Sequence, residues 1–111
     1  MFTRRKQGAI NLISGAAPLA GQSLPALGTA VTECLADGQP KAVFDMQNVP
    51  LMDSKGLELL LDLQDQFVRR VGELKLAAPS PLCRDILTAT GIASQFEIYR
   101  EVKTAIGSFV Q

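Results

Sequence analysis

Residues 41–57 read KAVFDMQNVPLMDSKGL, and this stretch decides the fold. Its first part, residues 41–46, is a short apolar run without helical period, which predicts a buried β-strand. After a loop over residues 47–52, the polar group at residues 53–56 precedes leucines at helical spacing. A buried strand that leads through a short loop into a long amphipathic helix is typical of an α/β fold.

The alternation of strands and helices continues on both sides of this stretch. We expect four further strands, at residues 2–7, 9–14, 73–77 and 96–99. We expect helices that start at the N-caps Ser23 and Ser80, before Pro25 and Pro81, and a last helix along Val102, Ala105, Ile106 and Phe109. Alternating elements require crossover connections, so the sequence predicts one α/β domain over residues 1–111. Its sheet is expected to be mixed and mostly parallel, with four to five strands covered by about four helices.

The long helix that follows residues 53–56 is expected to end at Gly72. Its predicted inner face comprises Leu57, Leu60, Leu61, Phe67, Val68 and Val71. Leu59 and Leu63 form a second apolar stripe, which either contacts a neighbouring helix or belongs to a partner interface.

The composition excludes several classes of function. The 111 residues contain 11 basic and 11 acidic side chains and no histidine. A zero net charge argues against a nucleic-acid-binding protein, and the lack of histidine excludes a Ser–His pair. Cys34 and Cys83 fit neither a CxxC pair nor a disulfide framework, so we expect two buried, unreactive thiols in a reducing cytoplasm. No apolar run reaches the roughly 20 residues that span a bilayer, and we expect no metal or cofactor site.

The segment from Asp53 to Leu57 is the one place where the sequence suggests a functional site. Ser54 is expected to cap the long helix, which is the structural interpretation. Lys55 and Gly56 are poor choices for a first helical turn, because the dipole disfavours a cation there and glycine weakens the helix. Both residues suit a site that sometimes carries an anion and that another protein's backbone approaches closely. Ser54 is therefore also a candidate phosphorylation site.

These residues resemble the STAS domain, and within it the bacterial anti-sigma factor antagonists. That family has an apolar strand, a short loop and then Asp-Ser-Ser-Gly-Leu at the start of a helix. Residues 43–46 and 52–57 match this pattern, residues 12–15 resemble the family's second strand, and residues 89–96 resemble the turn after its third helix.

The resemblance implies a non-enzymatic, cytoplasmic switch in bacterial transcription regulation. The unphosphorylated antagonist binds an anti-sigma factor that is also a serine kinase of the histidine-kinase ATPase type. Phosphorylation of the serine that matches Ser54 releases the complex, and a serine phosphatase reverses this. Asp53, Lys55, Gly56 and Leu57 are then the surroundings of the phosphorylation site and part of the partner-binding surface, and ATP is the kinase's cofactor.

Two positions depart from the family pattern. Lys55 replaces the second serine, and Ala16-Ala17-Pro18 stands where acidic residues often contact the partner. The alternative implied by the same resemblance is a constitutive subunit of a lipid-transport ABC system or of a stress-signalling scaffold. In that alternative Ser54 is only a helix cap.

Overall fold

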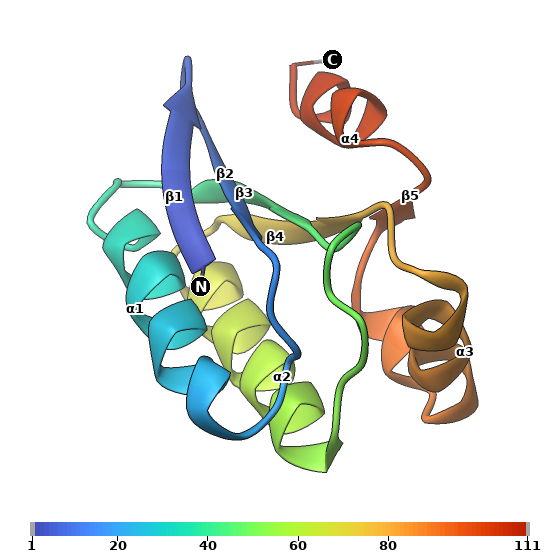
Figure 1. Cartoon of the computed structure of the whole chain (residues 1–111). Helices are drawn as coiled ribbons and strands as arrows, with labels where there is room; N and C mark the ends of the chain where they lie inside the picture. Colours follow the sequence, from blue (N-terminus) through green and yellow to red (C-terminus); the bar gives the residue numbers. More distant parts are fainter. Residues whose placement is uncertain (1, 111) are drawn as a thin grey trace.

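The computed structural model describes residues 2–110, which form a five-stranded sheet in the order β1-β2-β3-β4-β5. Strands β1 and β2 form an antiparallel hairpin, and the other neighbours pair in parallel (Figure 1). The strands are β1 (Phe2–Gln7), β2 (Ile10–Gly15), β3 (Lys41–Asp45), β4 (Glu73–Ala77) and β5 (Ile98–Tyr99). The helices are α1 (Leu24–Cys34), α2 (Ser54–Arg69), α3 (Pro81–Ala89) and α4 (Val102–Ser108), with 3₁₀ turns at Gly21–Ser23 and Ile92–Gln95. The predicted α/β class and mostly parallel sheet are confirmed.

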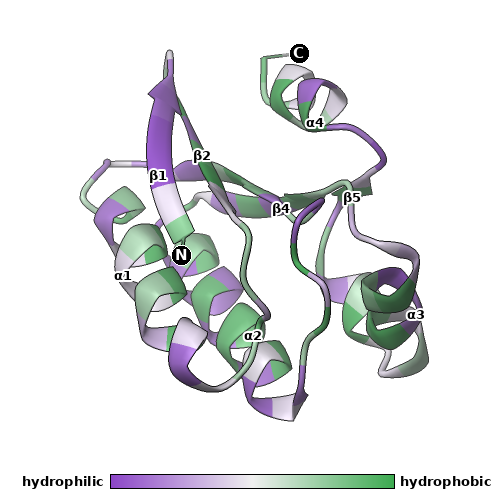
Figure 2. Ribbon diagram, in the orientation of Figure 1, coloured by the Kyte–Doolittle hydropathy of each residue, from purple (hydrophilic) through white to green (hydrophobic). Residues whose placement is uncertain are grey.

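The two faces of the sheet carry separate cores. Helices α1, α2 and α3 cover one face, where the largest buried side chains include Phe44, Phe67 and Leu60. Helix α4 alone lies on the other face, over a smaller cluster that includes Leu12 and Val43. The edge strand β1 is hydrophilic along most of its length (Figure 2), a composition that discourages pairing with another chain.

Three details differ from the sequence-based expectations, and a fourth, the cap of α3, agrees with them. Ser23 has helical backbone angles and makes no capping bond, because a 3₁₀ turn leads directly into α1. Strand β5 is only two residues long, and Phe96 and Glu97, which were expected to belong to it, lie outside it. Val68 and Val71 are exposed, whereas Leu63 and Gln64 belong to the inner face of α2. Ser80 does cap α3, with its hydroxyl accepting from the Cys83 amide at 3.3 Å.

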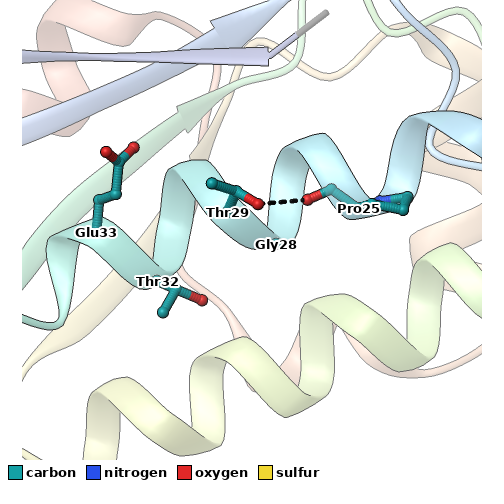
Figure 3. A pocket seen from close by; sticks show the side chains of 5 residues that line it. All are labelled: Pro25, Gly28, Thr29, Thr32 and Glu33. Atoms are coloured by element: carbon teal, nitrogen blue, oxygen red, sulfur yellow. Dashed lines mark hydrogen bonds between the residues drawn. The ribbon is translucent and has the colours of Figure 1, made fainter.

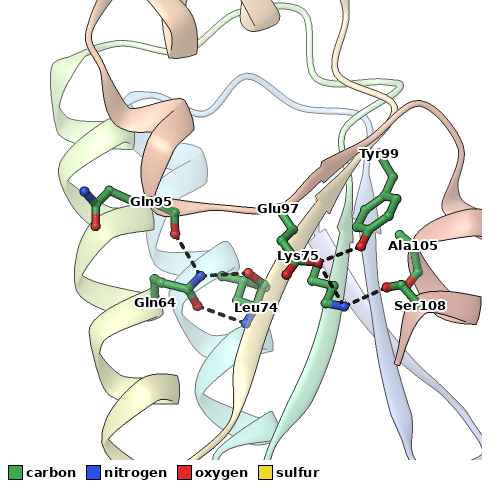
Figure 4. Close-up of polar contacts among 8 residues, drawn as sticks. All are labelled: Gln64, Leu74, Lys75, Gln95, Glu97, Tyr99, Ala105 and Ser108. Atoms are coloured by element: carbon green, nitrogen blue, oxygen red, sulfur yellow. Dashed lines mark hydrogen bonds and ion pairs between the residues drawn. The ribbon is translucent and has the colours of Figure 1, made fainter. Parts of the chain in front are cut away.

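Buried polar side chains complete the sheet where β5 is too short to do so. The Gln64 amide accepts from the Leu74 N–H at 2.9 Å and donates to the Leu74 carbonyl at 3.0 Å (Figure 4). The backbone N–H and carbonyl of Leu74 therefore have hydrogen-bond partners, although β5 pairs only with Leu76 and Ala77 of β4. Buried backbone groups require such partners.

On the opposite face, Lys75 is only 4% exposed and anchors α4. Its ammonium donates to the Ser108 hydroxyl at 2.7 Å (Figure 4). The same ammonium lies 4.1 Å from the centre of the Phe109 ring. It also lies 3.3 Å from the carboxylate of Glu97. Hydrogen bonds from Tyr99 and Lys75 hold the pKa of Glu97 below its ordinary value.

Both cysteines are buried and free, as expected. Burial raises the pKa of the Cys34 thiol to about 11, and this thiol donates to the Ala30 carbonyl at 3.6 Å. Cys34 therefore stays protonated at neutral pH, which makes it a structural rather than a reactive thiol.

Helix α2 ends in a Schellman motif that places a β-branched residue in the left-handed region. The Gly72 N–H bonds the Phe67 carbonyl at 2.8 Å, and the Val71 N–H bonds the Val68 carbonyl at 2.9 Å. Val71 has φ 58° and is 76% exposed, so it bears the strain of this conformation without a compensating burial.

We expect Val71→Gly to raise the free energy of unfolding by about 1 kcal/mol, because glycine removes that strain. Val68→Gly, the same change on an exposed helical residue, is the control and should lower stability instead. Urea unfolding followed by circular dichroism measures both. A loss of stability for Val71→Gly would contradict the assignment of strain.

Candidate functional site

The N-terminus of α2 is capped by Asp53, not by Ser54. Asp53 has an extended backbone (φ −111°, ψ −177°), and its carboxylate accepts from the Gly56 N–H at 2.9 Å. Its carbonyl accepts from the Leu57 N–H at 3.0 Å. The prediction that Ser54 caps the helix is therefore wrong, and the reason is that the carboxylate one residue earlier already satisfies the first turn.

Ser54 is the first helical residue, and its side chain is exposed. Its hydroxyl forms no hydrogen bond with any residue in the range 2–110, and Lys55 beside it is also exposed. The backbone N–H groups of these two residues likewise lack an acceptor within that range, as is usual for the first turn of a helix. An exposed hydroxyl next to unpaired N–H groups and an ammonium group is well placed to carry an anionic substituent.

Gly56 is buried against the chain's own backbone. A Cβ atom at this position would lie 2.0 Å from the Leu19 carbonyl oxygen, so only glycine fits. This gives an intramolecular reason for the glycine, in place of the expected close approach by another protein. Leu57 is also buried and, with Met52, occupies the positions of a hydrophobic staple around the Asp53 cap.

The loop between β2 and α1 is held against the start of α2 by backbone hydrogen bonds. The Leu19 N–H bonds the Leu51 carbonyl at 2.9 Å, and the Asp53 N–H bonds the Leu19 carbonyl at 3.3 Å. The loop that contains residues 16–18, singled out from the sequence as lacking acidic residues, is therefore fixed to the start of α2 through Leu19. Of these, Ala16 is exposed, while Ala17 and Pro18 are half-buried.

One exposed apolar side chain in this region was missed by the sequence analysis. Leu51 is 44% exposed although it lies next to the buried Met52. The sequence contains no signal for this exposure, because Leu51 follows Pro50 in an irregular loop, where no periodicity indicates which way a side chain points. Leu59 is half-buried and Leu63 is in the core, so the second stripe of α2 is largely an internal contact.

A shallow hollow lies on α1, and it has fewer free polar groups than the start of α2. It measures about 440 Å³ and is lined by Pro25, Gly28, Thr29, Thr32 and Glu33 (Figure 3). The Thr29 hydroxyl is already bonded to the Pro25 carbonyl at 3.0 Å.

Within residues 2–110 no group of three His, Cys, Asp or Glu side chains could hold a metal ion. None of the described helices is long and apolar enough to cross a membrane.

The sequence profile of the STAS domain matches residues 3–105, so the chain belongs to the STAS domain family. Among curated proteins, no sequence matches this one.

Three solved structures illustrate the similarity of the fold. An anti-sigma factor antagonist from Mycobacterium paratuberculosis matches with a TM-score of 0.88 and 22% identity, over 100% of this chain and 94% of that chain. The anti-sigma factor antagonist SpoIIAA in its unphosphorylated form matches with a TM-score of 0.80 and 17% identity, over 98% and 96% of the two chains. The murine Solute Carrier 26 family member A9 anion transporter matches with a TM-score of 0.78 and 13% identity, over 92% of this chain and 18% of the transporter. At these identities the likeness establishes a shared fold.

We expect Asp53→Ala to lower the free energy of unfolding by about 1 kcal/mol, because it removes the helix cap. Ser54→Ala should change it by no more than about 0.5 kcal/mol, as for an ordinary surface substitution. Asp53→Asn keeps a capping oxygen and serves as the control. Urea unfolding of the three variants measures this, and equal losses for Asp53→Ala and Ser54→Ala would contradict the assignment of the cap.

We expect Gly56→Ala to lower the free energy of unfolding by about 2 kcal/mol, since the new methyl group overlaps the Leu19 carbonyl and overpacking has costs of this size. Gly28→Ala is the matched control, because Gly28 lies in α1 with open space around its Cβ position. That variant should gain up to about 1 kcal/mol from higher helix propensity. Thermal unfolding compares the two. A Gly56→Ala variant as stable as wild type would show that the loop is not held against α2.

Proposed function

We propose that this protein is an anti-sigma factor antagonist-like switch and that Ser54 is its phosphorylation site. The observation that carries this proposal is the exposed Ser54 hydroxyl, which does not cap the helix because Asp53 does so. A phosphoryl group added there breaks no hydrogen bond among residues 2–110. Membership of the STAS family and the likeness to anti-sigma factor antagonists support it.

The local electrostatics favour a phosphate on the folded domain. A phosphoserine carries a charge of about −1.5 to −2 at neutral pH. At the first position of α2 this charge faces the positive end of the helix dipole, with the free N–H groups of Ser54 and Lys55 beside it. The Lys55 ammonium adds attraction, and Asp53 on the other side adds repulsion. Phosphorylation is therefore expected to leave the helix start folded.

The effect of the phosphate falls on the docking surface. Around Ser54 this surface contains the exposed Leu51, the uncharged segment 16–18 and the outer side of α2. An apolar partner surface that covers Ser54 would have to bury the new charges, which is costly without paired cations. Asp53, Lys55 and the exposed hydroxyl are the polar contacts of this surface, whereas Gly56 and Leu57 act by holding its shape.

The partner in this proposal is an anti-sigma factor that is also a serine kinase of the histidine-kinase ATPase type. The unphosphorylated protein binds it and frees the sigma factor, phosphorylation of Ser54 ends the complex, and a serine phosphatase restores binding. The protein itself acts in the bacterial cytoplasm by binding and not by catalysis. ATP serves the kinase.

A second candidate is a constitutive subunit or domain of a transport system. The observation that favours it is that part of an anion transporter shares this fold. Because Asp53 provides the cap, Ser54 would have no role in the stability of such a subunit. A complex with a transport ATPase that is insensitive to charge at position 54 would distinguish this candidate.

We expect protein isolated from its native host to include a fraction that is heavier by one phosphoryl group, located on Ser54 by peptide mass spectrometry. Ser54→Ala should abolish the modification. Ser94→Ala should leave it unchanged, because Ser94 is an exposed serine at a different surface. Unmodified protein in every growth condition, or a phosphate that persists in Ser54→Ala, would contradict the proposal.

A second experiment measures the affinity of the protein for the partner that co-purifies with its unmodified form. Ser54→Asp should weaken that complex by about tenfold or more, since about 1.4 kcal/mol of repulsion has this effect. Its melting temperature should not fall below the wild-type value, because an acidic side chain at this helix start is stabilising; this separates lost binding from lost folding. A Ser54→Asp variant that binds as tightly as wild type would favour the constitutive subunit.

A further inference from the structure

A second cleft lies on the sheet face opposite α2, between α4 and the β1–β2 hairpin. It has a volume of about 420 Å³, which is within the range of small-molecule sites. The cleft exists because α4 is only seven residues long and is anchored towards β4 by the Lys75–Ser108 bond. The sheet surface nearer to β1 is therefore left partly open.

Two basic side chains line this cleft and form no ion pair among residues 2–110. The ion pairs among residues 2–110 use Lys6, Arg69 and Lys75, so no carboxylate among them lies within ion-pair distance of Arg5 or Lys103. Arg5 comes from β1 and Lys103 from α4, so the two cations enter the cleft from different elements. A pair of unpartnered cations in a concave site favours an anionic ligand.

The surface between these cations is apolar. Leu12 is 7% exposed at the sheet, and Val102 and Ile106 of α4 are half-buried. These three side chains offer an aliphatic surface that a hydrated inorganic ion would not use. A ligand with an apolar body would gain from displacing water there.

A carboxylate, that of Asp45 at the end of β3, also lines the cleft. Asp45 is only 8% exposed, and its two oxygens accept from the Gln47 backbone N–H at 3.0 Å and from the Gln47 side chain at 3.2 Å. Each oxygen has a further lone pair, and Asp45 forms no ion pair among residues 2–110. A ligand is therefore expected to present an N–H or O–H donor to Asp45 and to keep its own anion away from it.

We propose that this cleft binds a small amphiphilic organic anion. Its carboxylate or phosphate group pairs with Arg5 and Lys103, its apolar body covers Leu12 and Ile106, and a hydroxyl or amino group donates to Asp45. The site is on the other side of the sheet from Ser54, so it does not depend on phosphorylation of that residue.

The test uses octanoate, octylamine and octanol, which share a chain length and differ in charge. Titration of the isotope-labelled protein should move the backbone amide signals of β1, β2 and α4 with octanoate, and much less with the amine or the alcohol. The 8-hydroxyoctanoate anion should bind more tightly than octanoate, because its hydroxyl reaches Asp45.

The double variant Arg5→Gln/Lys103→Gln should weaken octanoate binding by about tenfold or more. Arg84→Gln/Arg100→Gln is the matched control, since it removes the same charge from exposed residues outside the cleft and should bind octanoate as wild type does. Circular dichroism checks that both variants fold. No signal change with octanoate, equal binding of octylamine, or equal binding by both double variants would overturn the proposal. Equal affinity for octanoate and its hydroxyl derivative would overturn the role of Asp45.

Discussion

The contact between the Leu19 carbonyl and Gly56 is the constraint on which the arrangement of residues around Ser54 depends. It joins the loop after β2 to the first turn of the helix after β3, two segments more than thirty residues apart in sequence. The Leu19–Leu51 and Leu19–Asp53 hydrogen bonds join the same loop to the residues that precede this turn. Any side chain larger than hydrogen at position 56 would overlap the Leu19 carbonyl, so the loop could not keep this position against the helix.

This arrangement divides tasks between adjacent residues. Asp53 satisfies the helix start, Gly56 permits the close approach, and Leu57 fills the core beneath. Ser54 and Lys55 are left exposed, and their side chains form no hydrogen bond or ion pair among residues 2–110. A residue that can be modified without loss of structure is what a reversible switch requires, because the modified protein must remain available for reactivation.

Much of the fold follows from the sequence because its signals are local. The apolar run at residues 41–46 and the alternation at 73–77 predict the central strands, and Ser80-Pro81 predicts the start of α3. The predicted N-cap of α2 is wrong by one residue because Asp and Ser are both good caps. The extended backbone of Asp53 and its bond from the Gly56 N–H distinguish them, and neither is visible in the sequence.

Other features depend on tertiary contacts that no local pattern contains. Val68 falls on the apolar side of a helical wheel, yet it is exposed near the end of α2. Lys75 alternates with leucines in a way that predicts a solvent-facing side chain, and only the position of α4 makes it buried. Gln64 has a polar side chain in an apolar face, because the short β5 leaves the backbone of Leu74 to be satisfied.

The two faces of the sheet respond differently to charge. At the start of α2 a negative charge meets a helix dipole and free N–H groups, an interaction that typically stabilises a fold by about 0.3–1 kcal/mol. On the proposed function, the same charge opposes burial of that surface by a partner. Phosphorylation would then stabilise the free domain slightly while it weakens the complex, so the two effects favour the same free state. On the α4 face the cations belong to side chains without partners, so a bound anion there would act on α4 and β1 and leave the start of α2 unchanged.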